Sequence, residues 1–202
     1  RADGTLNPRF GTGGVAITDF GHDDACNALA LQRDGKPVLV GYSDDGAEAV
    51  VAVARFESGG APDSGFGTAG LATAAAGNGL SGSGVVIRPD ERIAVGGAFL
   101  NPATGWDFAL VLFEVDGTVA GTFGSGGLAE ADLGGEDTGR GLIRQYDGTL
   151  ALGGAADAAA ADAAGIAWHA ADGAPDTRFG GGTGQTILDL SGPATPDDAR
   201  AT

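Results

Sequence analysis

The phrase FGTGG at residues 10–14 returns along the chain as FGTAG at 66–70, FGSGG at 123–127 and FGGGT at 179–183. The Phe-Gly pairs that open these phrases are separated by 56, 57 and 56 residues. Self-similarity at a fixed period is the signature of an array of small units, each of which buries its apolar face against the next. The spacing therefore predicts a repeat protein.

Within the unit 10–65, four stretches have the composition of β-strands: apolar residues dominate or alternate, and glycine-marked turns separate them. The middle pair flanks Asp34-Gly35, a strong hairpin signal because glycine, and to a lesser degree aspartate, tolerates positive φ. The predicted strands of this unit are 14–20, 27–32, 37–43 and 49–56.

The following units repeat this pattern. The predicted strands are 71–75, 84–88, 92–99 and 108–114 in the second unit, 128–133, 141–145, 149–155 and 165–169 in the third, and 186–190 near the end. Residues 155–164 (AADAAAADAA) are predicted to form a loop or one helical turn.

Four short antiparallel strands per unit are typical of a β-propeller blade, so the predicted fold class is all-β, an array of four-stranded blades. A stacked β-solenoid is the rival, but its coils are normally shorter and lack the repeated hairpin. Because closed propellers contain about 4–8 blades, we expect the chain to be part of a longer chain or a homo-oligomer. The predicted division is the end of a preceding blade at 1–9, blades at 10–65, 66–122 and 123–178, and the first strand of a further blade at 179–202.

The chain of 202 residues carries 27 acidic and 11 basic residues, a formal charge of −16. Such a charge repels nucleic acid and anionic membranes, so we expect neither nucleic-acid binding nor membrane insertion. Cys26 is the only cysteine, which excludes an intrachain disulfide, and we expect it to be a small buried hydrophobe. The two histidines, His22 and His169, are interpreted as surface residues.

An Asx residue stands three positions before Phe-Gly in three of the four phrases. Its side chain can accept a hydrogen bond from a backbone amide and fix the turn, which predicts a structural role. The predicted structural turn residues are Asn7, Asp63 and Asp176, with the phenylalanines Phe10, Phe66, Phe123 and Phe179.

Two weaker patterns suggest ligands. Trp106, in the polar loop NPATGWD, could stack on a sugar or a protein partner, and with Asp107 it forms the candidate ligand-binding pair; local packing is the alternative. Asp23 and Asp24 are the candidate metal ligands for Ca²⁺, which takes six to eight oxygens; solvated loop charge is the alternative. We expect no other cofactor. The glycine-rich phrases lack the helix and lysine of a phosphate-binding loop.

The segments ADGTLNPRFGTGG, DACNALALQRDGKPVLVGYS and AVVAVARFESGGAPDSGFGTAG resemble the delta-60 repeat family of bacterial proteins. The resemblance covers nearly the whole chain. It implies β-propeller blades and a secreted or cell-surface bacterial protein, and it implies no catalytic residues. The chain departs from the family pattern at Asp90-Glu91, where glycine is missing, and at Ala120, where the Asx residue is missing.

These observations predict a non-enzymatic structural or interaction module that presents loops on a rigid scaffold. A carbohydrate-binding propeller with one site per blade is the alternative, and a hydrolase is the less favoured third possibility. The identity of a protein or glycan partner does not follow from these patterns.

Overall fold

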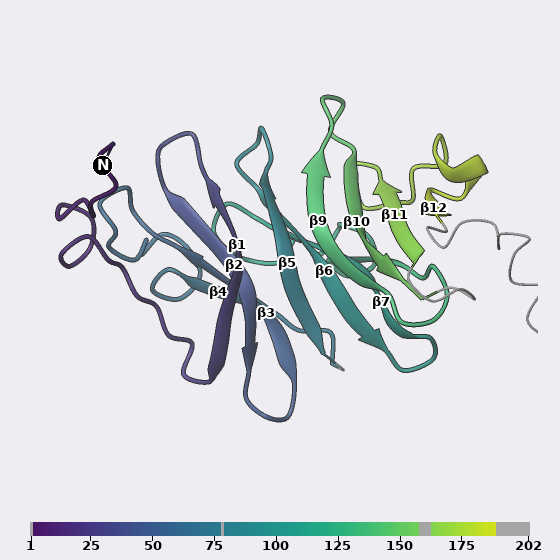
Figure 1. The fold of residues 1–202 in the computed structure, drawn as a ribbon, viewed down its shortest axis with the longest axis horizontal. Coiled ribbons are helices and arrows are strands. Elements are labelled where there is room, and N and C mark those ends of the chain that lie inside the picture. The colour runs from purple at the N-terminus through teal and green to yellow at the C-terminus, as the bar shows by residue number, and fades with distance from the viewer. Residues whose placement is uncertain (1, 78, 158–162, 189–202) are drawn as a thin grey trace, which may run out of the picture.

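The computed structural model describes residues 2–77, 79–157 and 163–188. In these residues the chain forms twelve β-strands and one short 3-10 helix, η1 (Gly180–Gly182). The strands make three four-stranded antiparallel sheets that stand side by side along the long axis of the molecule and do not close into a barrel (Figure 1). The predicted all-β class and the blade-like sheets are confirmed.

In each sheet the strands follow one another in chain order, so every neighbour is joined by an antiparallel connection. Sheet 1 consists of β1 (Asp23–Leu31), β2 (Pro37–Asp44), β3 (Ala49–Arg55) and β4 (Leu71–Ala74). Sheet 2 consists of β5 (Leu80–Ile87), β6 (Ile93–Asn101), β7 (Gly105–Phe113) and β8 (Leu128–Ala131). Sheet 3 consists of β9 (Thr138–Arg144), β10 (Leu150–Ala156), β11 (Ala163–His169) and β12 (Gln185–Leu188).

Each sheet takes its fourth strand from the repeat that follows. β4 lies after Phe66 in the sequence but pairs with β3, and β8 and β12 pair with β7 and β11 in the same way. The sheets therefore span 23–74, 80–131 and 138–188, whereas the repeat boundaries at 66, 123 and 179 lie between a third and a fourth strand. β12 accordingly completes sheet 3, and residues 189 and 190 of the strand predicted there lie outside the described residues.

The same stagger explains one wrong prediction. Residues 14–20 form no strand; only Val15 makes an isolated bridge, to Thr12. The equivalent residues of the next two repeats form β4 and β8 because a third strand from the preceding repeat lies beside them. The described residues before Gly14 contain no such strand, so this segment has no neighbouring strand to pair with. Of the predicted loop at 155–164, residues 158–162 lie outside the described residues.

Two apolar cores lie between neighbouring sheets. The first joins Val38, Val40, Val51 and Val53 of sheet 1 to Ile93, Val95, Val111 and Phe113 of sheet 2, and it includes Phe66. The second joins Phe108, Leu110 and Leu112 of sheet 2 to Leu142, Leu150 and Leu152 of sheet 3, and it includes Phe123. Alternate residues of β6 and β7 therefore face opposite neighbours, as the period of two in a strand requires.

The second strand of each sheet carries a glycine at the same step of the repeat, opposite an irregularity in the first strand. The registers of the β1–β2, β5–β6 and β9–β10 pairs each shift by one residue, as at a β-bulge. At Gly97 in β6, an added Cβ would lie 1.8 Å from the carbonyl oxygen of Ser81 on β5. Gly41 and Gly154 meet the same obstacle, so only glycine fits at this step of the repeat.

In the described part of the chain, no helix has the length and apolar character that crossing a lipid bilayer requires.

Candidate functional site

The loops of the sheets gather at two ends of the molecule that differ in charge. The hairpin turns at 32–36, 88–92 and 145–149 lie along the upper side of Figure 1, and the β2–β3 and β6–β7 loops lie along the lower side. We call the loops on the second side, residues 19–24, 44–48, 101–107 and 130–137, the acidic end. These loops contain many carboxylates and no lysine or arginine.

The opposite end has mixed charge. Every ion pair between described residues lies there, from Arg33–Glu91 to Arg178–Asp147. The carboxylates of the acidic end therefore form no ion pair with a lysine or arginine among the described residues, and His22 is the one basic side chain in these loops.

Three carboxylates converge at the acidic end, between sheets 2 and 3. Asp107 comes from β7, and Asp132 and Asp137 come from the loop between β8 and β9. One oxygen of each lies within 4.8 Å of the other two. Asp107 and Asp137 are buried, with 1% and 0% of their surface exposed, whereas Asp132 is open to solvent. We call these three residues the aspartate cluster.

Backbone amides hold the cluster's loop in place. The amide of Leu133 donates to Asp137 Oδ2 at 2.7 Å, and the amide of Gly134 donates to Asp132 Oδ1 at 2.7 Å. On the other side, the hydroxyl of Thr104 donates to Asp107 Oδ2 at 2.7 Å. The second oxygen of Asp107, Oδ1, is buried and receives no hydrogen bond from the described residues.

Burial and mutual repulsion disfavour the charged forms of these groups. Burial is the main cause that raises the pKa of Asp107; the Thr104 hydroxyl opposes it, and the carboxylate of Asp132 adds to it. Burial likewise raises the pKa of Asp137 above its usual value, against hydrogen bonds from the amides of Leu133 and Asp157. The neighbouring Glu130 has a raised pKa, again mainly through burial.

The predicted metal ligands Asp23 and Asp24 lie elsewhere, at the start of β1. Asp23 is exposed, and Asp24 Oδ2 accepts the amide of Phe20 at 2.7 Å. Asp132 and Asp137, which sequence reasoning missed, occupy the equivalent loop of the third repeat. The signal was present: residues 19–24 read DFGHDD, and residues 132–137 read DLGGED. The third carboxylate, Asp107, comes from the neighbouring sheet and could not be found by this comparison.

The candidate ligand pair is split by the fold. Trp106 is half-buried, while Asp107, the next residue along β7, turns into the protein. Trp106 carries a structural contact of its own, because its carbonyl accepts a hydrogen bond from the amide of Asp137. The pair therefore does not present one common surface to a ligand.

The predicted turn residues make the expected kind of hydrogen bond. The side chains of Asn7, Asp63 and Asp176 each accept the backbone amide two residues later. Ala120 keeps the same backbone turn without a side-chain acceptor, since Phe123 still donates to the Ala120 carbonyl at 2.9 Å. At the other departure from the repeat, Glu91 adopts the positive φ of 64° that glycine supplies elsewhere.

The four phenylalanines differ in burial. Phe66 and Phe123 lie between two sheets, while Phe10 and Phe179 are half-buried. The glycine after each of the first three is bonded to the next repeat: Gly67 donates to the Asp116 carbonyl at 2.7 Å, and Gly11 and Gly124 make the equivalent bonds.

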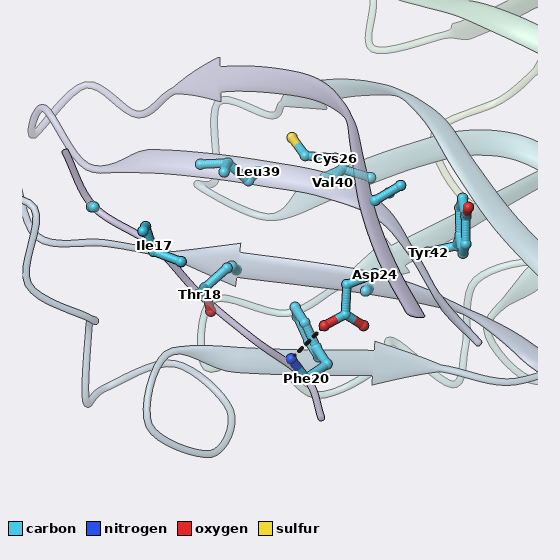
Figure 2. A pocket seen from close by; sticks show the side chains of 13 residues that line it. Ile17, Thr18, Phe20, Asp24, Cys26, Leu39, Val40 and Tyr42 are labelled. Atoms are coloured by element: carbon cyan, nitrogen blue, oxygen red, sulfur yellow. Dashed lines mark hydrogen bonds between the residues drawn. The ribbon is translucent and has the colours of Figure 1, made fainter. Parts of the chain in front are cut away.

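Two expectations about single residues are wrong. Cys26 is exposed, because the irregular β1 strand places it at the open face of sheet 1. There it lines a pocket of about 220 Å³; Figure 2 shows Ile17, Thr18 and Phe20 beside it, with the Phe20 amide bonded to Asp24. His169 is buried where Phe56 and Phe113 stand in the other repeats, and burial lowers the pKa of its imidazole.

The comparisons with known proteins agree with this architecture. Residues 32–66 and 88–123 each match a family described as a domain of unknown function (DUF5122) beta-propeller. No curated protein matches the chain. The two matched segments begin 56 residues apart, and each runs from the first hairpin turn of its sheet to the phenylalanine of the Phe-Gly phrase, so the match follows the period of the repeat. The three sheets and this match together establish that the chain carries β-propeller blades.

Proposed function

We propose that the chain is a non-enzymatic interaction module that presents the loops of its acidic end on a β-propeller scaffold, in a secreted or cell-surface protein of a bacterium. The separation of charge between the two ends carries the proposal. Loops rich in carboxylates and free of lysine and arginine create a negative field that attracts a basic surface and steers its approach. The partner that fits this end is a basic segment of another protein.

The placement of Cys26 and of the two histidines supports a non-enzymatic role. Cys26 Sγ donates only to the Ala28 carbonyl, and no hydrogen bond joins His22 or His169 to another side chain among the described residues. A hydrolase would need a nucleophile within reach of a base. We therefore keep a hydrolase as the least favoured reading.

A carbohydrate-binding propeller remains the alternative, and Trp106 is the residue that would carry it. A lectin with one site per blade should repeat its aromatic residue in each unit. The sequence has Ala49 at the matching position of the first unit and Asp162 at that of the third, and neither is aromatic. The half-buried indole and the inward-facing Asp107 also give a sugar little surface to stack on.

Removing charge from the acidic end should weaken binding of a basic peptide. The variant Asp44→Asn/Asp45→Asn/Glu48→Gln keeps the side-chain oxygens that accept backbone amides in and near this loop. We expect its Kd for a lysine-rich peptide, measured by calorimetry at low salt, to rise on the order of ten-fold. Added salt should reduce the difference, because exposed charges are screened.

A matched control removes the same charge from the opposite end. Asp34, Asp116 and Asp172 are exposed, and each accepts the amide two residues later, so Asn can replace each without loss of the turn. This triple variant should bind the peptide nearly as well as the unchanged protein. An equal loss in both variants would contradict the proposal, and sugar binding abolished by Trp106→Ala would favour the lectin alternative.

The outer faces of the array indicate a second kind of contact. On sheet 1, Leu29 is 67% exposed, although its equivalents Val85 and Leu142 pack against the preceding sheet. On sheet 3, Ile166 stands where Val53 and Leu110 pack against the following sheet. These faces have the residues that join blades elsewhere in the molecule. We propose that another blade of the same repeat covers them, supplied by further chain or by a second copy.

Expressed as these 202 residues, the protein should pair head to tail, because two copies bring six blades together, within the range of closed propellers. We expect sedimentation equilibrium to give twice the chain mass of 19.6 kDa. Leu29→Arg should shift the protein toward one chain, whereas Ile143→Arg, on an exposed residue of β9, should not. A mass of one chain at every concentration would refute self-pairing.

A further inference from the structure

We propose that the aspartate cluster of Asp107, Asp132 and Asp137 is a calcium site that joins sheets 2 and 3. Asp107 lies on β7 of sheet 2, Asp132 and Asp137 lie in the loop that connects sheet 2 to sheet 3, and one oxygen of each lies within 4.8 Å of the other two. This spacing lets one cation contact all three. The inference concerns the joint between two sheets and does not depend on the partner proposed above.

The burial of two of the carboxylates shows that the cluster differs from ordinary surface charge. A buried charge is normally paired with an opposite charge or bound to a metal, because its transfer from water is costly. Asp107 and Asp137 are almost wholly buried, yet neither forms an ion pair with a described lysine or arginine. The loops of the acidic end contain no lysine or arginine.

The unpaired oxygen is the second, independent observation. Asp107 Oδ1 is buried and accepts no hydrogen bond from the described residues, although the other oxygen of this carboxylate is held by Thr104. Thr104 thus fixes the carboxylate, and its free oxygen belongs to the same group that approaches Asp132 and Asp137. A cation bound there would satisfy this oxygen and balance the three charges.

The donor set selects the class of metal. All three side chains offer hard oxygen ligands, and the cluster contains no cysteine or histidine, which favours Ca²⁺ or Mg²⁺ over zinc or copper. Calcium tolerates irregular geometry and completes its shell of six to eight oxygens with carbonyls and water. Because Asp132 is exposed, water can reach the metal from the solvent side.

Calcium should stabilise the chelator-treated full chain. With a Kd on the order of 10⁻⁴ M, as in extracellular modules, about 10 mM CaCl₂ should raise the Tm by roughly 5–10 °C. Titration calorimetry should show one site per chain, and MgCl₂ should bind at least ten-fold more weakly. Terbium provides a spectroscopic check: excitation of the indole of Trp106 should sensitise its emission, CaCl₂ should quench it, and Trp106→Phe should abolish it.

Asp107→Asn separates a metal ligand from a merely structural residue. The substitution removes a buried charge, so the Tm in chelator should equal or exceed that of the unchanged protein, while the calcium response is lost. Asp132→Asn, at an exposed position, retains an oxygen for the Gly134 amide and should weaken Ca²⁺ binding about ten-fold. Its matched control is Asp19→Asn, because Asp19 makes the same bond to Gly21 in the first repeat. The control should leave the calcium response unchanged.

Three results would overturn the proposal. The first is the absence of both heat and a Tm shift in CaCl₂, and the second is an equal response of Asp19→Asn and Asp132→Asn. The third is a chelated protein that ignores CaCl₂ but gains stability on acidification. Protons would then neutralise Asp107 and Asp137, which are faced by Asp132, Glu136 and Glu130 and by no basic group among the described residues.

Discussion

Alanine in place of Asp63 is expected to destabilise the protein by about 3–5 kcal/mol, because it leaves the charge of Arg55 buried without a negatively charged partner. Arg55 Nε donates to Asp63 Oδ2 at 2.7 Å, and the two side chains are only 6% and 3% exposed. The guanidinium also donates to the Val115 carbonyl at 2.8 Å and lies over the ring of Phe66. It therefore cannot turn toward water without breaking the joint between sheets 1 and 2.

The repeat itself supplies the compensating variant. Leu112 and Ala120 occupy the positions of Arg55 and Asp63 in the second repeat, and both are buried. The backbone hydrogen bond is the same in both repeats: the amide of Asp63 donates to the carbonyl of Arg55, and the amide of Ala120 donates to the carbonyl of Leu112. The double variant Arg55→Leu/Asp63→Ala should therefore recover most of the lost stability, since an apolar pair can replace a buried ion pair at little cost. Urea unfolding of the four proteins measures the coupling free energy.

Asp176 provides the control at the equivalent position of the third repeat. Its partner Arg178 is 69% exposed, so water screens the pair. Asp176→Ala should cost much less than Asp63→Ala, and most of its cost should come from the lost turn bond to the Arg178 amide. Similar costs for Asp63→Ala and Asp176→Ala would show that burial of Arg55 has no energetic weight.

Low pH should weaken the ion pair between Arg55 and Asp63. Burial alone would raise the pKa of Asp63, but hydrogen bonds from Lys36, the amide of Gly65 and Arg55 outweigh it and hold the pKa well below its usual value. The folded state therefore favours the charged carboxylate. Its contribution to stability is complete above the ordinary aspartate pKa of 3.8 and is lost as the pH falls toward the folded value.

The sequence could predict the sheets because their signals are local. The Asp-Gly hairpin turns, the apolar run that begins at Pro37 and the Phe-Gly phrases each depend on a few adjacent residues, and β2 and β3 formed where they were expected. The stagger of the fourth strand could not be predicted in this way. Residues 14–20 and 71–75 have similar strand signals, and only the presence of β3 makes the second a strand.

The candidate site was harder to predict because it depends on contacts between repeats. Asp23 and Asp24 were chosen for being adjacent in sequence, whereas in the aspartate cluster Asp107 lies 25 positions before Asp132 and 30 before Asp137. The burial of single side chains could not be predicted from their positions in the sequence either. Cys26 is exposed because it faces the open side of sheet 1, and His169 is buried because it takes the place of a phenylalanine. Each outcome follows from which neighbouring sheet is present.

The phenylalanine of each Phe-Gly pair should contribute strongly to the stability of the interface between two neighbouring sheets. Phe66 is fully buried in the core between sheets 1 and 2, where it packs with residues of both. Replacement by alanine removes this packing and leaves a cavity that the surrounding strands can fill only in part. We expect Phe66→Ala to lower the free energy of unfolding by about 3–5 kcal/mol, measured by urea denaturation.

The same residue at another step of the repeat gives the control. Phe123 lies between sheets 2 and 3, so Phe123→Ala should lower the free energy of unfolding about as much as Phe66→Ala. Phe10 is half-buried, so Phe10→Ala should lower it by about 1 kcal/mol or less. If Phe10→Ala were as harmful as Phe66→Ala, the phenylalanine would be needed for its own turn and not for the joint. We expect instead that the contribution of this phenylalanine to the free energy of unfolding depends on whether a second sheet packs against it. Stability in an array of repeats is distributed in this way, over the interfaces between neighbouring units.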